Sequence, residues 1–176
     1  MLLNAKNIAI CGIAMALAVI AIIMSGVLSV NTLALLFIAG FISGMVAVDM
    51  GIVVGAVFVA GTFFLGFFLA PVKSYCFTYL AFALYLLLTE GCYKFFEKKG
   101  KKDITVIMWV IKFVLFNACY IPVLIFLPEV LLGKQITGFM WIAAIVAGQI
   151  ALVIFDIAYN TLFLKYWKPL RARIMR

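Results

Sequence analysis

The sequence predicts an all-α membrane protein, a six-helix transmembrane bundle with both termini in the cytoplasm. Three observations predict it: 69% of the 176 residues are hydrophobic, only 11% are charged, and the apolar residues form six long runs. Soluble domains are about 45–50% apolar and about 25% charged. This chain has too few polar residues to cover a surface that faces water, which excludes a cytosolic enzyme, a secreted domain and a nucleic-acid-binding domain.

The six apolar runs approach the roughly 20 residues that a helix needs to cross a bilayer. Turn residues, prolines or charged residues separate them, and none shows the alternation of a barrel strand. The second run, about 16 residues long, rises only about 24 Å, so it is a short span, a partly shielded one, or one extended by its flanks. Together the runs predict a single domain over residues 1–176. The spans cover about residues 8–30, 33–48, 51–69, 74–93, 104–127 and 138–164.

The basic residues predict the orientation of the bundle. Eleven of the 14 Lys and Arg residues lie in three clusters: Lys6, the lysines of 94–102, and the basic residues of 165–176. Six spans bring these clusters to one side and leave only Lys73 and Lys134 on the other. Because cytoplasmic loops carry an excess of Lys and Arg, we expect both termini in the cytoplasm. The expected location is a bacterial plasma membrane.

Two charged residues inside the spans predict a buried ion pair. By helix rise, Lys112 lies about 13 Å from the inner end of the fifth span, and Asp156 lies at a similar depth on the sixth. Opposite charges at matching depth favour pairing. The pair either locks the two helices together or takes part in handling a substrate or a proton. Alternatively, Lys112 extends its ammonium group to the inner surface.

Five residues are candidates for binding a small molecule in the outer half of the bundle. Asn117 and Gln149 lie at similar depths. Their amides either form hydrogen bonds between the two helices or line a polar cavity. Tyr120 shares a face with Asn117. Tyr79 and Trp141 offer aromatic walls, although aromatic residues near span ends are also typical of an interfacial belt.

The 128–137 segment is the longest predicted loop on the outer side. It carries Glu129, Lys134 and Gln135, and a loop of this length is able to close over a captured molecule. Few charges lie near the outer half of the bundle. The sequence therefore favours a neutral or zwitterionic, ring-bearing ligand.

The residues that enzymes and metal sites require are scarce. The chain has no His, and it lacks both paired carboxylates in one span and a GxSxG motif, so we expect no enzyme activity. The four cysteines have no CxxC spacing and predict neither a metal site nor a disulfide framework. We expect no cofactor, and we interpret the cysteines as small packed hydrophobes.

Small residues recur at four-residue spacing in the first three spans. Gly40 and Gly44 form one GxxxG motif, and a second begins at Gly51. On the first span, Ala14 and Ala18 form an AxxxA ridge. A ridge of small side chains lets another backbone approach closely, either within this chain or on a partner subunit.

In its size, six spans, inner termini and small-residue ridge, the chain resembles the substrate-binding S components of energy-coupling factor (ECF) transporters. The resemblance implies that the protein captures a vitamin or similar micronutrient from outside. It also implies that Ala14 and Ala18 dock onto a transmembrane coupling subunit driven by two ATPases, and this chain has no P-loop of its own. The alternatives are a scaffold or holin-like protein without a transport ligand, another kind of transporter, and a small membrane enzyme.

Overall fold

Long helices make up the computed structural model, which describes residues 5–28, 31–98, 105–126, 138, 140–167 and 169. Six helices are long and apolar enough to span a membrane, and no strand occurs in the described ranges. The all-α class and the six predicted spans are therefore confirmed. The elements are α1 (Ala5–Val27), α2 (Thr32–Met50), α3 (Ile52–Leu69), α4 (Ser74–Lys98), α5 (Thr105–Phe126), α7 (Met140–Leu162) and the π-helix η1 (Phe163–Trp167).

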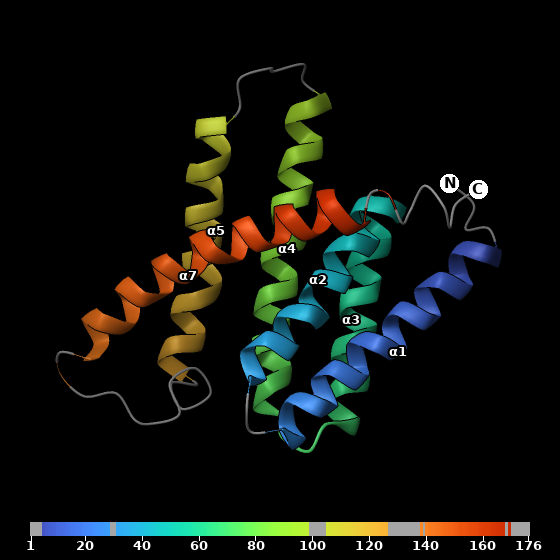
Figure 1. Cartoon of the computed structure of the whole chain (residues 1–176), viewed down its shortest axis with the longest axis horizontal. Coiled ribbons are helices and arrows are strands. Elements are labelled where there is room, and N and C mark those ends of the chain that lie inside the picture. The colour runs from blue at the N-terminus through green and yellow to red at the C-terminus, as the bar shows by residue number, and fades with distance from the viewer. Residues whose placement is uncertain are drawn as a thin grey trace. The chain divides into compact units, whose positions relative to one another are not determined.

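By its contacts, the chain divides into two compact units, where the sequence predicts a single domain. Residues 1–133 contain α1 to α5, and residues 134–176 contain α7 and η1 (Figure 1). Each unit is described by itself. The pairing of Lys112 with Asp156 and the matched depth of Asn117 and Gln149 join the two units, so both stay predictions.

Two other predicted features lie outside the described residues. One is the 128–137 lid with Glu129, Lys134 and Gln135, and the other is the end of the basic tail beyond residue 169.

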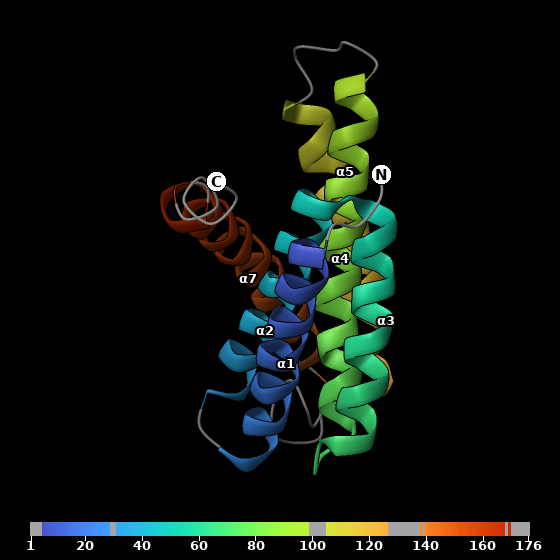
Figure 2. The same ribbon diagram turned by 90° about the vertical axis from the view of Figure 1, so that its right-hand side faces the viewer.

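In the first unit, α4 contacts α1, α2, α3 and α5. Figure 2 shows α1 to α4 side by side. The core between these four helices consists of side chains with little or no exposure. It includes Ala18, Ala21 and Ile22 of α1, Leu36, Ala39 and Val46 of α2, Phe58 and Val59 of α3, and Cys76, Tyr79 and Ala83 of α4.

Glycines set the spacing of α2, α3 and α4. Gly51 alone connects α2 to α3 and has φ of 102°, a conformation that L side chains rarely adopt. A Cβ atom at Gly55 would lie 2.6 Å from Cβ of Ala47, and one at Gly40 would lie 3.0 Å from Cβ of Phe82. The predicted GxxxG motifs therefore contain real points of close approach, while Gly51 itself serves the turn.

One end of the first unit gathers the start of α1, the α2–α3 turn and the end of α4. Sγ of Cys11 in α1 lies 3.0 Å from Sδ of Met50 at the end of α2. The ammonium group of Lys94 donates hydrogen bonds to the carbonyl oxygens of Ala47 and Val48, at 2.8 and 3.1 Å. These bonds hold α4 against the end of α2, and α4 continues to Lys98, past the predicted end of its span.

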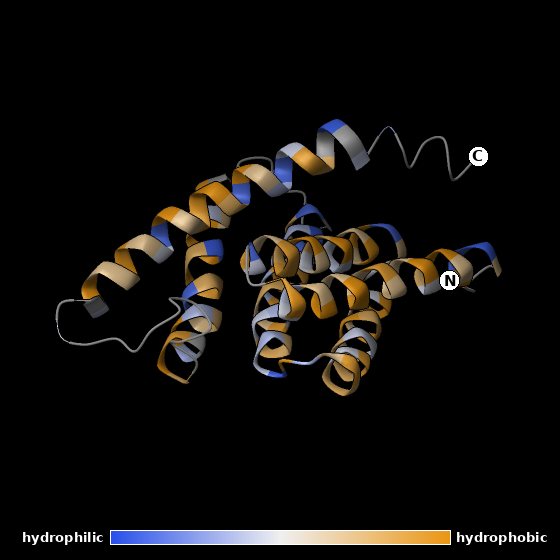
Figure 3. Ribbon diagram, turned by 60° about the horizontal axis from the view of Figure 1, so that its bottom comes forward, coloured by the Kyte–Doolittle hydropathy of each residue, from blue (hydrophilic) through white to orange (hydrophobic). Residues whose placement is uncertain are grey.

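The outer faces of the helices are apolar, the reverse of a soluble bundle. Val53 is 77% exposed, Phe68 80% and Phe126 79%. Figure 3 shows hydrophobic residues along most of each helix. Lipid chains do not penalise this exposure, and a helix satisfies most of its backbone polar groups internally, as a bilayer requires. An integral membrane protein is the class that fits.

Candidate functional site

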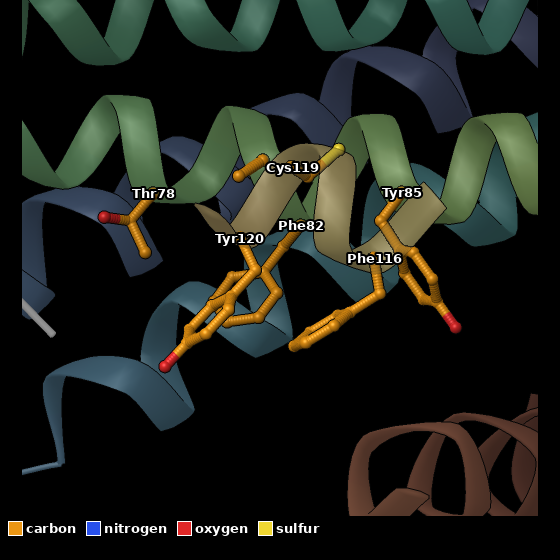
Figure 4. A pocket seen from close by; sticks show the side chains of 7 residues that line it. Thr78, Phe82, Tyr85, Phe116, Cys119 and Tyr120 are labelled. Carbon is orange, nitrogen blue, oxygen red and sulfur yellow. The ribbon is translucent and has the colours of Figure 1, made fainter. Parts of the chain in front are cut away.

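The candidate site is a pocket between α4 and α5, within the first unit. Thr78, Phe82 and Tyr85 occupy positions i, i+4 and i+7 of α4, which places them on one face of the helix. α5 contributes Phe116, Cys119 and Tyr120, and Ala81 completes the lining. Figure 4 shows the rings of Phe82, Phe116 and Tyr120 gathered on one side of the two helices, with Thr78 and Tyr85 at opposite ends.

The aromatic rings of the pocket are held against one another. The rings of Phe116 and Tyr120 stack with centroids 5.1 Å apart and an angle of 14° between their planes. The ring of Tyr85 meets Phe116 edge-on, at 6.0 Å and 87°. Such contacts stabilise aromatic pairs beyond the burial of their area. They give the pocket defined apolar walls, as expected of a small-molecule site.

Thr78 is the small polar group of this pocket. Its side chain is 2% exposed, and its hydroxyl has no hydrogen-bond partner in the part of the chain that the structure describes. A buried hydroxyl without a partner costs free energy, about 1–3 kcal/mol by analogy with mutational data.

The pocket is small as it stands, and it adjoins a larger groove. The pocket has a volume of about 30 Å³, and the groove about 310 Å³. The two hollows share Ala81 and Cys119. The groove is lined by Phe77, Leu80, Ala81 and Leu84 of α4 and by Ala118, Cys119, Pro122 and Phe126 of α5.

Pro122 shapes the α5 side of the groove. Proline has no N–H group, so the helical hydrogen bond from residue 122 to the carbonyl oxygen of Ala118 cannot form. Both residues line the groove. The α5 backbone is therefore weakened at the level of the candidate site, where a bound molecule would need room.

The site lies towards the α3–α4 end of the unit. Thr78 is four residues and Tyr85 is eleven residues from the start of α4 at Ser74, which corresponds to about 6 and 17 Å along the helix. The sequence predicts a ligand site in the outer half of the bundle on helices that include α4 and α5, and this stays a prediction.

Among the predicted ligand-binding residues of the first unit, Tyr120 lines the pocket. Asn117 lies on α5, where its amide donates to the carbonyl oxygen of Phe113 at 2.8 Å. Tyr79 lies in the core with 0% exposure, and its hydroxyl is 2.7 Å from the hydroxyl of Ser43 in α2. Tyr79 therefore faces α2, and this position gives it a packing role.

The predicted residues of the second unit lie on α7. Trp141 is in its first turn, and Gln149 is near its middle. The amide of Asn160 donates to the backbone oxygen of Asp156 at 2.9 Å and to its carboxylate at 3.1 Å. The Asp156 carboxylate thus has a hydrogen bond within its own helix.

Lys112 lies among aromatic rings of the first unit. Its ammonium group is 5.4 Å from the ring centre of Tyr93 in α4 and 5.6 Å from that of Trp109 in α5. Cations at this distance are attracted to the ring faces. This contact contributes to holding the last turns of α4 against the first turns of α5.

The ridge of α1 lies inside the bundle. Ala18 is 0% exposed, and Ala14 packs against the same core. Two residues along a helix turn by about 200°, so the other small residues, Gly12 and Ala16, lie on the opposite, exposed face. A Cβ atom at Gly12 would meet nothing within 4 Å. A partner that approaches α1 closely would therefore meet Gly12 and Ala16.

The pocket involves residues that the sequence did not single out. On α4 the sequence indicated Tyr79, whereas Thr78, Phe82 and Tyr85 line the pocket. The signal that could have found it is the four-residue spacing of Thr78 and Phe82 on α4 and of Phe116 and Tyr120 on α5. Nothing in that pattern distinguished a hollow from a filled contact.

Comparison with known proteins gives no match to a protein family, to a curated protein or to a solved structure. Among the described residues, no group of three or more His, Cys, Asp or Glu is placed to hold a metal ion.

Proposed function

We propose that this chain is the substrate-capturing membrane subunit of an ECF-type micronutrient uptake transporter. The α4–α5 pocket and the groove beside it bind the substrate, a small, uncharged, ring-bearing and vitamin-like molecule. The observation that carries this proposal is the pair of hollows itself, which aromatic side chains of α4 and α5 line. A helix contact that served packing alone would gain stability from filling the hollows.

The charge distribution supports capture from outside. The start of α1, with Lys6, and the end of α4, with Lys94 and Lys98, lie at one end of the first unit, and Lys73 lies at the other. The positive-inside rule then orients the basic end towards the cytoplasm of a bacterial cell. The pocket lies in the outer half of the membrane, on the side from which an uptake substrate arrives.

The exposed small residues of α1 support docking onto a coupling subunit. Gly12 and Ala16 allow another helix to approach the α1 backbone closely, as in other small-xxx-small contacts. In this proposal they take the docking role that the sequence assigned to Ala14 and Ala18. The coupling subunit and its two ATPases supply the energy for release of the substrate into the cell.

A scaffold without a transport ligand is the second candidate. The small volume of the pocket, about 30 Å³, favours it, because a cavity of this size admits water-sized groups and no ring without movement of side chains. A scaffold would have no need of ATPase partners.

Copurification from the native host separates the two candidates. The wild-type chain is expected to bring a coupling subunit and two ATPases. Ala16→Trp should abolish their recovery while the melting temperature of the chain stays unchanged, since Ala16 is exposed. Ala18→Trp, the same change on the buried face, should prevent folding. A wild-type chain that purifies without ATPases, or an Ala16→Trp variant that retains them, would contradict the proposal.

A further inference from the structure

The two walls of the groove between α4 and α5 differ in how firmly they are held. Within the first unit, α4 contacts α1, α2 and α3 as well as α5, and α5 packs against α4. Residues of α4 next to the groove belong to the core that these four helices share. The α4 wall is therefore supported from behind by other helices of its own unit.

Two contacts fix the α4 wall against α2. The hydroxyl of Tyr79 lies 2.7 Å from that of Ser43, and a Cβ atom at Gly40 would lie 3.0 Å from Cβ of Phe82. Tyr79 and Phe82 directly flank two groove-lining residues of α4 in the sequence. A displacement of this part of α4 would break a buried hydrogen bond and a close packing contact, and both changes cost free energy.

The α5 wall contains a weak point in its backbone. Pro122 lies inside α5, so one hydrogen bond of the helix, to the carbonyl oxygen of Ala118, is missing. A proline inside a helix is a usual cause of bending. Ala118, Pro122 and Phe126 all line the groove, and their four-residue spacing places them on one face of α5. Bending at the missing bond therefore changes the distance of Phe126 from α4.

The same bend alters the pocket beside the groove. Tyr120 lies between Ala118 and Pro122 in the sequence, whereas Phe116 precedes both. Bending between them disturbs the stack of the Phe116 and Tyr120 rings, whose centroids are 5.1 Å apart and which line the pocket. At about 30 Å³, the pocket admits no ring without such a movement.

We propose that the last turns of α5 form a movable wall, hinged at Pro122, and that their movement relative to the fixed wall of α4 opens the two hollows to a ring-bearing molecule. The inference rests on the part of the proposed function that assigns the hollows to a ligand. It adds the movement by which that site adapts to the size of its occupant.

Hydrogen exchange of backbone amides measures the hinge. The full chain in detergent is digested after exchange, and residues 119–126 are followed by mass spectrometry. Pro122→Ala supplies the missing N–H group, so it should slow exchange of this segment at least about tenfold, which is about 1.4 kcal/mol in the free energy of opening. Ile121→Ala is the matched control on the same turn, because Ile121 is 42% exposed and lines neither hollow. It should leave the exchange rate unchanged.

Binding of naphthalene, an uncharged ring system, measures the opening of the hollows. The full chain in lipid nanodiscs is dialysed to equilibrium against empty nanodiscs, which corrects for partition into lipid. Pro122→Ala should weaken binding at least about tenfold, because an uninterrupted helix resists bending. Ile121→Ala should bind as the wild type does.

A glycine variant separates the hinge from the lining of the groove. Pro122→Gly loses the proline ring from the groove, as Pro122→Ala does, but its backbone still bends easily. It should therefore bind naphthalene within about threefold of the wild type, since glycine retains the freedom that alanine removes. Melting temperatures establish that each variant folds.

Three results would overturn the inference. The first is an exchange rate of residues 119–126 that is the same in Pro122→Ala and in the wild type. The second is an equal loss of binding in Pro122→Ala and Pro122→Gly, as expected if the proline ring itself contacts the ligand. The third is a wild type that binds no naphthalene beyond partition into lipid. Failure of the ATPases to copurify, in contrast, contradicts the transport function and leaves the hinge untouched.

Discussion

The two faces of α4 show two different kinds of helix contact. Against α2, the helices approach closely at Gly40, and the hydroxyl of Tyr79 is paired with that of Ser43. Against α5, large aromatic rings line a hollow, and the hydroxyl of Thr78 has no hydrogen-bond partner among the described residues. The contact between α4 and α2 is closely packed and its hydroxyls are hydrogen-bonded, as a stable core requires. The contact between α4 and α5 keeps a hollow, as a binding site requires.

The largest loss of stability should follow from placing a side chain in the close contact between α2 and α3. A Cβ atom at Gly55 would lie 2.8 Å from the Ala47 backbone, so Gly55→Leu should destabilise the chain by about 3 kcal/mol or more, or prevent folding. Gly12→Leu, at an open position of α1, should change the free energy of unfolding by no more than about 0.5 kcal/mol. Thermal melting in detergent measures both. Equal effects would mean that α2 and α3 are not in close contact.

Breaking the hydrogen bond between the hydroxyls of Tyr79 and Ser43 should lower the free energy of unfolding by a smaller amount. Ser43 donates to the carbonyl oxygen of Ala39 at 3.1 Å, so the Tyr79 hydroxyl is the donor in the bond between them. Tyr79→Phe removes this bond together with the hydroxyl, whereas Ser43→Ala removes the bond and leaves the polar Tyr79 hydroxyl in the core. Ser43→Ala should therefore be the more destabilising change. A double-mutant cycle should give a coupling of about 0.6–1.7 kcal/mol, and a coupling of zero would show that the two hydroxyls do not interact.

The smallest change in the free energy of unfolding should be a stabilising one, at Thr78. Thr78→Val replaces an unpartnered hydroxyl by a methyl group of the same size, so it should leave the stability of the ligand-free chain unchanged or raise it by up to about 1 kcal/mol. Unfolding in detergent, after ligand has been removed, measures this. A clear loss of stability would show that Thr78 serves packing and would remove the contrast between the two faces of α4.

Much of the fold was predictable because its signals are local. Runs of apolar residues, charges and prolines mark the ends of spans, and the predicted ends lie within a few residues of the observed ones for most helices. The continuation of α4 to Lys98 was not predictable in this way. It accompanies the bonding of Lys94 to carbonyl oxygens of α2, a contact between residues far apart in the sequence.

The sequence directs attention to helices four and five, because aromatic and polar residues recur along them, but it does not identify the residues that line a pocket. Which face of α4 meets α5 depends on packing against α2, where the Tyr79 hydroxyl finds Ser43. The same limit applies to α1, because Ala14–Ala18 and Gly12–Ala16 have equal spacing, and the sequence alone does not show which pair faces the core.

Mass spectrometry of small molecules released from the purified chain tests the central claim, that the α4–α5 pocket holds a ligand. From the native host, the wild type should release an uncharged compound at about one molecule per chain, and so should Ala60→Leu, a change at an exposed position of α3. Ala81→Leu, which places a larger side chain in the lining of both hollows, should release little or none although its melting temperature shows that it folds. The account would be contradicted if the wild type carried no compound beyond bulk lipid, or if Ala81→Leu retained the compound in full.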